Sequence, residues 1–258
     1  MNAKFEQFRQ LHHAEKLFVL PNAWNAKSAV ILQQQGFAAI ATSSAAVAES
    51  LGYSDGEEMS FQEYLTVIKR ILDVITIPLT VDIETGYGKT DDEIYVNIKQ
   101  LVEAGVAGIN IEDSVINKND RTLKDATTFA NTITFIKNKL TADNLKLFIN
   151  IRCDTYILNF ANKQAETAHR LNIYELCGAD GIFLPCIADE KDIEEAVRHA
   201  KLPINVMCIP GLPGFDTLNK LGVKRVSMGP FMFQKVYQEI KKLSQAIISD
   251  SNFSALFA

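Results

Sequence analysis

The sequence predicts a (β/α)₈ barrel, an α/β fold in which parallel strands alternate with helices. Two observations carry this prediction. Short runs rich in Val, Ile, Leu, Phe and Ala alternate strictly with longer amphipathic segments along the 258-residue chain. Glycines also end several of the helix-like segments, and the next apolar run begins within about four residues, as αβ loops usually do.

Each apolar run is short enough to be a buried strand. The runs lie at residues 17–23, 38–44, 78–84, 108–113, 146–154, 181–186, 203–209 and 225–230. Helix-like segments between and after them include residues 60–75, 90–104, 126–140, 163–177, 190–200 and 231–248.

Local signals support these helices. Ser60 with Glu63, and Thr90 with Glu93, have the spacing of capping boxes, in which two side chains satisfy free backbone N–H groups. The C′ position after a helix favours glycine because φ is often positive there. The glycines expected at such positions are Gly36, Gly105, Gly178 and Gly222.

A doubly wound open sheet is the alternative fold, but no GxGxxG turn follows the first apolar run. Because no low-complexity linker or shift in composition divides the chain, we expect a single barrel domain over residues 1–258. Its C-terminal helical tail would begin at about residue 231. Apolar side chains at Phe253, Leu256 and Phe257 predict that this tail docks, either on its own barrel or on a partner subunit.

Bulk composition narrows the class of function. Hydrophobic residues make up 47% of the chain, which is enough for a sizeable core. A net charge of −5 and the absence of any basic run argue against nucleic-acid binding. No apolar run has the length of a signal peptide or a membrane span, so we expect a cytoplasmic protein without a membrane partner.

The most informative motif is Val81-Asp82-Ile83-Glu84-Thr85-Gly86-Tyr87-Gly88, at the end of the third apolar run. Residues two apart on a strand point to the same face, so Asp82 and Glu84 are expected to project together. Like charges on one face repel unless a cation or a shared proton relieves them. A metal site is therefore the first hypothesis, and two solvated acids at a strand end are the alternative.

Other predicted strands end in polar residues as well, and in a barrel these ends gather at one rim. The second is followed by Ser43, Ser44 and Ala45, whose backbone N–H groups could face an oxyanion, and by Asp55 farther along the loop. The fourth ends at Glu112-Asp113 and the fifth at Arg152 and Asp154.

Such hard oxygen ligands favour Mg²⁺, with Mn²⁺ as an alternative, and Mg²⁺ commonly takes only one or two protein carboxylates. Arg152 could bind a substrate carboxylate or phosphate, or form an ion pair with a neighbouring acid. The histidines are predicted to be surface residues rather than ligands or bases: His12, His13, His169 and His199.

At these residues the chain resembles the isocitrate lyase/phosphoenolpyruvate mutase superfamily, over roughly residues 17–230. The similar segments are Leu20-Pro21-Asn22-Ala23-Trp24, residues 43–55, residues 82–88, Gly108-Ile109-Asn110-Ile111-Glu112-Asp113 and Ile151-Arg152-Cys153-Asp154. Residues 221–230 are similar to the phosphonomutase-like subgroup.

The resemblance implies that Mg²⁺ chelates an α-oxocarboxylate or its enolate at the rim of the barrel. Asp82 would bind the metal directly, and Asp55, Glu84 and Glu112 would hold its waters. Ser43, Ser44 and Ala45, together with Asp82, would contact the substrate, with the backbone of Ser44 and Ala45 at the enolate oxygen. Arg152 would bind the substrate carboxylate, and Asp55 and Arg152 are the candidate catalytic residues. Homodimers or homotetramers that exchange the last helix are implied too.

Two departures from the superfamily pattern limit the reaction. Its usual Asp-x-Asp is Asp82-x-Glu84 here. The lyases carry Lys-Lys-Cys-Gly-His in the loop after the fourth strand, whereas residues 114–122 contain neither Cys nor His. Lys118-Asn119 is only weakly similar to the Lys-x-Asn-Ser element of the mutases. Cleavage of isocitrate or methylisocitrate is therefore not expected.

We accordingly predict a Mg²⁺-dependent lyase that acts on a small α-oxocarboxylate through an enolate, by C–C cleavage or decarboxylation of an oxaloacetate-like acid. One alternative is a phosphoenolpyruvate or phosphonopyruvate mutase, or a P–C bond hydrolase. The other is a protein that binds a metal and an oxoacid without turnover.

Overall fold

The computed structural model describes residues 2–117 and 120–257, and it confirms the barrel. Every strand of the main sheet lies within a run predicted from the sequence and pairs in parallel with its neighbours. These strands are β1 (Phe18–Leu20), β2 (Asn22–Ala23), β3 (Ile40–Thr42), β4 (Leu79–Asp82), β5 (Gly108–Glu112), β8 (Phe148–Arg152), β9 (Gly181–Leu184), β10 (Ile204–Met207) and β11 (Arg225–Ser227).

The barrel closes through its first strand, which is split in two. β1 pairs with β11 on one side, and β2 pairs with β3 on the other. Pro21 lies between the two halves and has no N–H to donate to a ladder, although its carbonyl accepts a 2.9 Å hydrogen bond from Ala41. The two halves together therefore occupy one strand position of the barrel.

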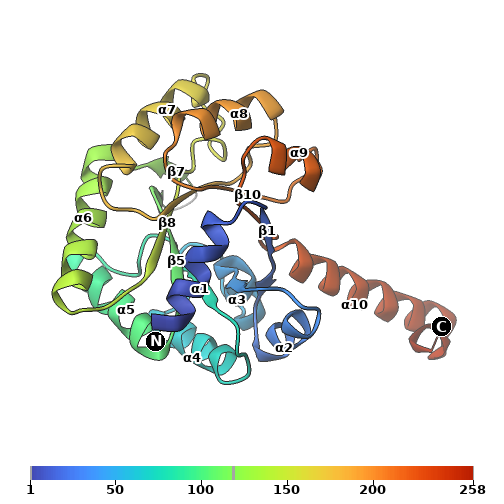
Figure 1. Cartoon of the computed structure of the whole chain (residues 1–258). Helices are drawn as coiled ribbons and strands as arrows, with labels where there is room; N and C mark the ends of the chain where they lie inside the picture. Colours follow the sequence, from blue (N-terminus) through green and yellow to red (C-terminus); the bar gives the residue numbers. More distant parts are fainter. Residues whose placement is uncertain (1, 118–119, 258) are drawn as a thin grey trace.

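Helices surround the sheet, as Figure 1 shows. All six helical segments predicted from the sequence are confirmed, as α4 (Phe61–Leu72), α5 (Asp91–Ala104), α6 (Ala126–Ala142), α7 (Lys163–Tyr174), α8 (Glu190–His199) and α10 (Phe231–Asp250). The capping boxes at Ser60 and Thr90 are both formed. The predicted glycines adopt positive φ, for example +106° at Gly105 and +90° at Gly222.

Several elements were not predicted. They are the helices α1 (Asn2–His13), α2 (Ala26–Gln34), α3 (Ser44–Leu51) and α9 (Phe215–Lys220), and the antiparallel hairpin formed by β6 (Ser114–Asn117) and β7 (Asp120–Leu123). Most of them are short, so their sequence periodicity is weak.

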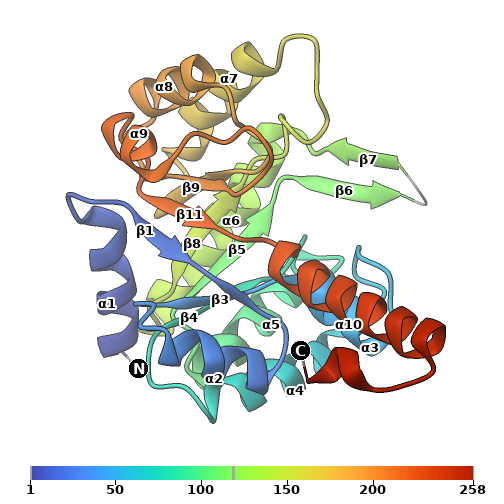
Figure 2. The ribbon, with the colours of Figure 1, turned by 90° about the vertical axis from the view of Figure 1, so that its right-hand side faces the viewer.

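Helix α1 packs across one mouth of the barrel, on the side opposite the β6–β7 hairpin (Figure 2). Its Phe8 meets Phe148 edge to face at 5.4 Å between ring centroids, and its His12 stacks on Phe148 at 4.1 Å. The prediction that His12 is a surface residue is therefore wrong. Burial lowers the pKa of His12 well below its usual value, so the ring is an uncharged part of this aromatic plug.

A polar ladder crosses the inside of the barrel. Asn150 donates to Asn110 at 2.9 Å, Asn205 donates to Asn150 at 2.6 Å, and Arg225 Nη2 donates to Asn110 at 3.1 Å. All four side chains are buried, where polar groups need such partners. The chain leaves room for the ladder at Gly181, because a Cβ there would lie 2.7 Å from Asn150 Oδ1.

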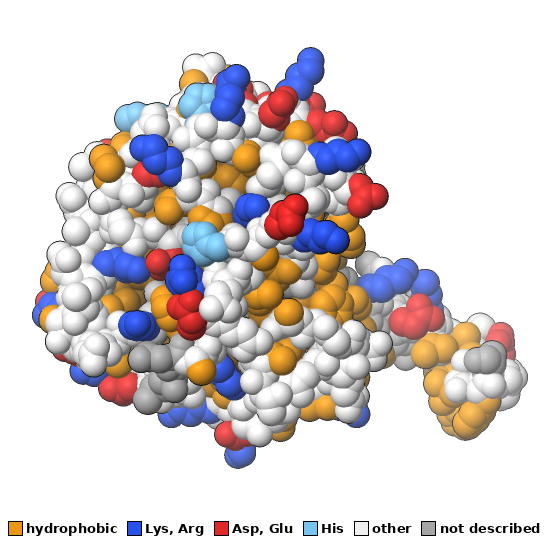
Figure 3. Space-filling view, viewed as in Figure 1, with side chains coloured by type: hydrophobic (Ala, Val, Ile, Leu, Met, Phe, Trp, Pro, Cys, Tyr) orange, Lys and Arg blue, Asp and Glu red, His pale blue; other side chains and the backbone are white. Residues whose placement is uncertain are grey.

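Helix α10 projects away from the barrel (Figure 1), and Phe233 is the one residue of this helix that is buried. Hydrophobic side chains gather beside the base of the helix and again at its far end (Figure 3). The exposed large hydrophobic side chains of this segment include Ile240 and Ile248 on α10, and Phe253 and Phe257 beyond it. Within residues 2–117 and 120–257, no helix is long and apolar enough to cross a membrane.

Candidate functional site

The hollow at the carboxyl ends of the strands has a volume of about 150 Å³. Six of the predicted site residues line it together: Ser43, Ser44, Ala45, Asp55, Asp82 and Arg152. They come from three separate parts of the chain, which the barrel brings to one rim. We call this hollow the rim pocket.

Asp82 lines the rim pocket and has one carboxylate oxygen without a hydrogen-bond partner among the described residues. Its backbone is fixed from two sides, because Tyr64 Oη donates to its carbonyl at 2.9 Å and its N–H donates to Thr42 Oγ1 at 3.2 Å. Ser44 Oγ donates to Oδ2 at 3.0 Å, whereas Oδ1 is buried without a hydrogen-bond partner among the described residues. Burial is the main reason why the pKa of Asp82 is raised.

The N-terminus of α3 faces the same pocket. Ser43 is the N-cap and accepts a 3.3 Å hydrogen bond from Ala46 N. Ser44 and Ala45 are the first two helical residues, and none of the hydrogen bonds found among the described residues uses their N–H groups. The predicted loop is thus a helix start, where free N–H groups and the helix dipole favour an anion.

Glu84 and Glu112 line a second hollow, of about 170 Å³, which we call the hairpin pocket because Val115 and Ile116 of β6 also line it. The expectation that Asp82 and Glu84 project from one strand face is wrong. β4 ends at Asp82, and Glu84 has a φ of +50°, outside strand geometry. The Glu57 carboxylate holds this turn by accepting from Thr85 N at 2.9 Å and from Tyr87 N at 2.9 Å.

The acidic side chains of the rim pocket and the hairpin pocket nevertheless interact electrostatically. Burial raises the pKa of Glu84 to about 8, with further contributions from Asp55, Asp82 and Glu112. Burial likewise raises the pKa of Glu112 to about 7 against the opposing effect of Arg152. The predicted acids are therefore one interacting cluster, although they line two hollows.

Arg152 makes the ion pairs that the sequence left as an alternative, and it also lines the rim pocket. Nε lies 2.7 Å from Asp154 Oδ1, Nη2 lies 3.1 Å from Asp154 Oδ2, and Nη1 lies 2.7 Å from Glu112 Oε2. Burial alone would lower the pKa of Arg152, but Glu112 and Asp154 hold it above its usual value. The guanidinium is thus a permanent, fixed cation.

Sequence reasoning missed Arg121, on β7. Its Nη1 donates to Glu112 Oε1 at 2.6 Å, to Asp154 Oδ2 at 2.8 Å and to Ser114 Oγ at 2.8 Å. The available signal was an arginine in the loop directly after the Glu112-Asp113 pair. The predicted Lys118-Asn119 element lies outside the described residues.

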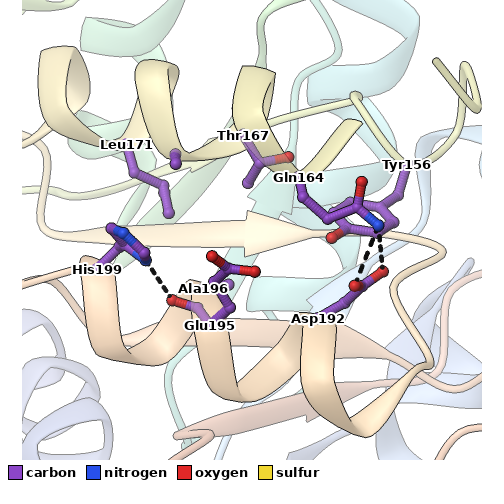
Figure 4. A pocket seen from close by; sticks show the side chains of 9 residues that line it. Tyr156, Gln164, Thr167, Leu171, Asp192, Glu195, Ala196 and His199 are labelled. Atoms are coloured by element: carbon purple, nitrogen blue, oxygen red, sulfur yellow. Dashed lines mark hydrogen bonds between the residues drawn. The ribbon is translucent and has the colours of Figure 1, made fainter. Parts of the chain in front are cut away.

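A further hollow, between α7 and α8, has a volume of only about 10 Å³ and is drawn in Figure 4. Gln164 Nε2 lies 3.2 Å from Asp192 Oδ1 there, and the His199 ring pairs with the Glu195 carbonyl at 2.8 Å. This space holds at most one water. Because this hollow lies between two outer helices, His199 is on the outside of the barrel, away from the rim pocket.

A family model described as phosphoenolpyruvate phosphomutase matches residues 8–248. The chain belongs to the phosphoenolpyruvate mutase/isocitrate lyase superfamily. It is 38% identical over 222 residues to an uncharacterized protein of Mycobacterium tuberculosis, covering 86% of this chain and 81% of that protein. It is 27% identical over 257 residues to oxaloacetate decarboxylase 1 of Pseudomonas fluorescens, covering 96% and 87%.

Solved structures agree with this assignment. A phosphonomutase-like protein of Burkholderia cenocepacia J2315 superposes with a TM-score of 0.88 at 31% identity, covering 95% of this chain and all of that one. Oxaloacetate acetylhydrolase, at 18% identity and a TM-score of 0.86, shares the fold.

Members of this superfamily generally use a divalent metal, and the rim pocket fits one. Among the residues that the structure describes, no three His, Cys, Asp or Glu side chains converge on a single point. Mg²⁺ does not need such a set, because it commonly takes one or two carboxylates and keeps several waters. The unpartnered Oδ1 of Asp82 suits a direct ligand, and Asp55 lines the same pocket.

Proposed function

We propose that the protein is a Mg²⁺-dependent lyase that acts on a small α-oxocarboxylate through an enolate, by decarboxylation or C–C cleavage of an oxaloacetate-like acid. One observation carries the proposal: three groups line one pocket, namely Asp82 with its unpartnered carboxylate oxygen, the start of α3 with its free N–H groups, and the fixed cation of Arg152. Mn²⁺ is the alternative metal.

Each group has a distinct task in this reaction. Arg152 binds the substrate carboxylate through a planar fork of N–H donors. The N–H groups of Ser44 and Ala45 bind the carbonyl oxygen and stabilise the negative charge that develops on it as the enolate forms. Asp82 would hold the metal, with Asp55 beside it in the same pocket; when bound, the metal would supply Lewis acidity next to the carbonyl.

The size of the rim pocket supports a small substrate. Drug-sized ligands occupy pockets of roughly 300–1,000 Å³. The rim pocket measures about 150 Å³, which suits an acid of a few carbons. The absence of Cys and His from residues 114–122 favours decarboxylation, because that reaction needs an electron sink more than a thiol acid in this loop.

The test is incubation with oxaloacetate and Mg²⁺, with and without chelator, against a protein-free control that measures the spontaneous reaction. We expect metal-dependent pyruvate, and at least a hundredfold loss of rate in Asp82→Ala. Asp216→Ala, at an exposed position of α9, is the matched control. No pyruvate above the protein-free rate, or an unchanged rate in Asp82→Ala, would contradict the proposal.

The second candidate is P–C bond chemistry on phosphoenolpyruvate or phosphonopyruvate. The family model and the phosphonomutase-like structure favour it. ³¹P NMR of phosphonopyruvate incubated with the protein distinguishes the two reactions, because only P–C chemistry moves the phosphorus resonance. Binding without turnover, the remaining alternative, predicts thermal stabilisation by oxalate with no product from either substrate.

For the assembly we propose a homodimer or homotetramer in which a second copy covers α10. The groove between α2 and α10 is almost wholly apolar, and Ile31, Val236 and Ile240 are among its exposed side chains. Most of α10 does not pack on its own barrel, so its apolar side chains are exposed. The apolar groove of a second copy could bury them, because the two surfaces have the same chemistry. Sedimentation of wild type against Ile240→Glu tests this, with a shift towards monomer expected.

A further inference from the structure

Two arginines and two carboxylates form a closed ring behind the rim pocket. Arg121 Nη1 lies 2.6 Å from Glu112 Oε1 and 2.8 Å from Asp154 Oδ2. Arg152 closes the ring from the other side, with Nη1 2.7 Å from Glu112 Oε2 and Nε 2.7 Å from Asp154 Oδ1. Positive and negative charges therefore alternate around the ring.

The four side chains of the ring are almost completely buried. Side-chain exposure is 16% at Arg121 and 13% at Arg152, against 1% at Glu112 and 0% at Asp154. Buried charges are stable only when each is paired and its hydrogen bonds are made. When both carboxylates are ionised, the ring has two cations and two anions and is neutral, so the four groups depend on one another.

Counting donors gives Arg121 a specific role. A guanidinium has five N–H donors. Asp154 accepts from Nε and Nη2 of Arg152, which leaves one N–H on Nη2. Nη1 forms an ion pair with Glu112 Oε2 at 2.7 Å without a hydrogen bond, so N–H donors remain on both Nη atoms. Arg121 Nη1 donates to Glu112 Oε1 and to Asp154 Oδ2. Ser114 Oγ donates to the same two oxygens, and Asp154 Oδ2 also accepts from Arg152 Nη2.

Without Arg121, two buried carboxylates would share one cation. Ser114 Oγ would still donate to both acids, but it carries no charge. Their negative charge would then draw on the last N–H donors of Arg152, because no other cation lies within 4.0 Å of either acid among the described residues. The guanidinium of Arg152 would rotate towards Glu112 and Asp154 and away from the rim pocket.

We propose that Arg121 is a positioning residue: by holding Glu112 and Asp154, it keeps two N–H donors of Arg152 free and oriented for a substrate carboxylate. The identity of that ligand rests on the proposed function, whereas the position of the Arg152 guanidinium is independent of it.

Binding tests the role in recognition. We expect Arg121→Gln to weaken oxalate binding in the presence of Mg²⁺ by at least tenfold by calorimetry. In the oxaloacetate assay it should raise KM by more than it lowers kcat. Arg121→Lys should recover part of both losses, because it restores the charge but not the fork. Arg198→Gln, at an exposed arginine on α8 with 72% side-chain exposure, is the matched control and should change neither.

Oxalate affinity and KM within twofold of wild type in Arg121→Gln would overturn the proposal. If Arg121→Gln does not fold, Arg121→Lys takes its place, and full retention of oxalate affinity there would overturn it equally. A purely structural role for Arg121 predicts lower stability with unchanged affinity, which is also a contradicting result.

A ligand-free crystal structure of Arg121→Gln provides a readout that does not depend on the proposed function. We expect the Arg152 guanidinium to rotate, with new contacts to Glu112 Oε1 or Asp154 Oδ2. An Arg152 fork that superposes on that of wild type would overturn the proposal. If wild type binds no oxalate while the fork still rotates in the variant, the proposed substrate class fails and the positioning role stands.

Discussion

Ser44 donates a 3.0 Å hydrogen bond to Asp82, which ties the first residue of α3 to the last residue of β4. The bond engages Oδ2 and leaves Oδ1 unpartnered among the described residues. One side chain thus orients the carboxylate that we expect to hold the metal, and in the proposed reaction the backbone N–H of the same residue would contact the substrate oxygen.

Ser44→Ala should weaken Mg²⁺ binding, because the Asp82 carboxylate loses the bond that orients it. A hydrogen bond to a charged group contributes about 1.5–3 kcal/mol, which corresponds to a loss of affinity of roughly ten- to a hundredfold. Calorimetric titration with Mg²⁺ measures the effect. Ser50→Ala, in the same helix but bonded to the Val47 carbonyl at 2.8 Å, should bind Mg²⁺ like wild type. Equal affinity in all three proteins would contradict the assignment of Asp82 as a ligand.

The metal-free protein should lose stability as the pH rises from about 5 to 9, because Glu84 has a folded-state pKa of about 8 against an ordinary value of 4.5. Between these values the folded chain retains a proton that the unfolded chain has released. The stabilisation is therefore complete below pH 4.5 and disappears as the pH passes through 8. Urea denaturation in EDTA at pH 6 and pH 9 measures it. Glu84→Gln should reduce the dependence without abolishing it, because Glu112, with a pKa of about 7, contributes in the same direction. Glu194→Gln, an exposed control on α8, should retain the wild-type slope.

Mg²⁺ should raise the melting temperature through binding to the folded state alone. At a hundred times its dissociation constant the gain is about 2.7 kcal/mol, or roughly 5–10 °C for a chain of this size. Differential scanning calorimetry with Mg²⁺ and with EDTA measures it. Asp82→Ala should abolish the shift, and a persisting shift in that variant would place the metal elsewhere.

His12→Ala should destabilise the protein without affecting the rim pocket, because it removes a ring stacked on Phe148 at the opposite mouth of the barrel. Truncation of a buried ring costs about 3–5 kcal/mol. Urea denaturation measures the loss, and His13→Ala, at an exposed neighbour, should cost less than about 0.5 kcal/mol. A stability equal to that of the His13 variant would show that α1 does not plug the barrel in solution.

The strands and the larger helices could be predicted because burial imposes a pattern on neighbouring residues. The start of α3 could not, since Ser43, Ser44 and Ala45 read equally well as a loop of small residues. Glu84 was misplaced because its left-handed backbone depends on Glu57, a contact between distant parts of the chain. Arg121 was missed for the same reason: its partner Asp154 lies 33 positions away, and only the fold brings them together.

The polar ladder inside the barrel also affects how the chain avoids misaligned strand pairing. Asn110 lies opposite Asn150 in the pairing of β5 with β8, and Asn205 lies opposite Arg225 in the pairing of β10 with β11. A slip of one residue would turn a strand's inward side chains outward and leave its partners buried without hydrogen bonds. An apolar interior would tolerate such slips more easily. The ladder therefore makes misaligned pairing costly for β5 with β8, which ends at Arg152, and for β10 with β11, so the interior of the barrel favours correct alignment before any ligand is bound.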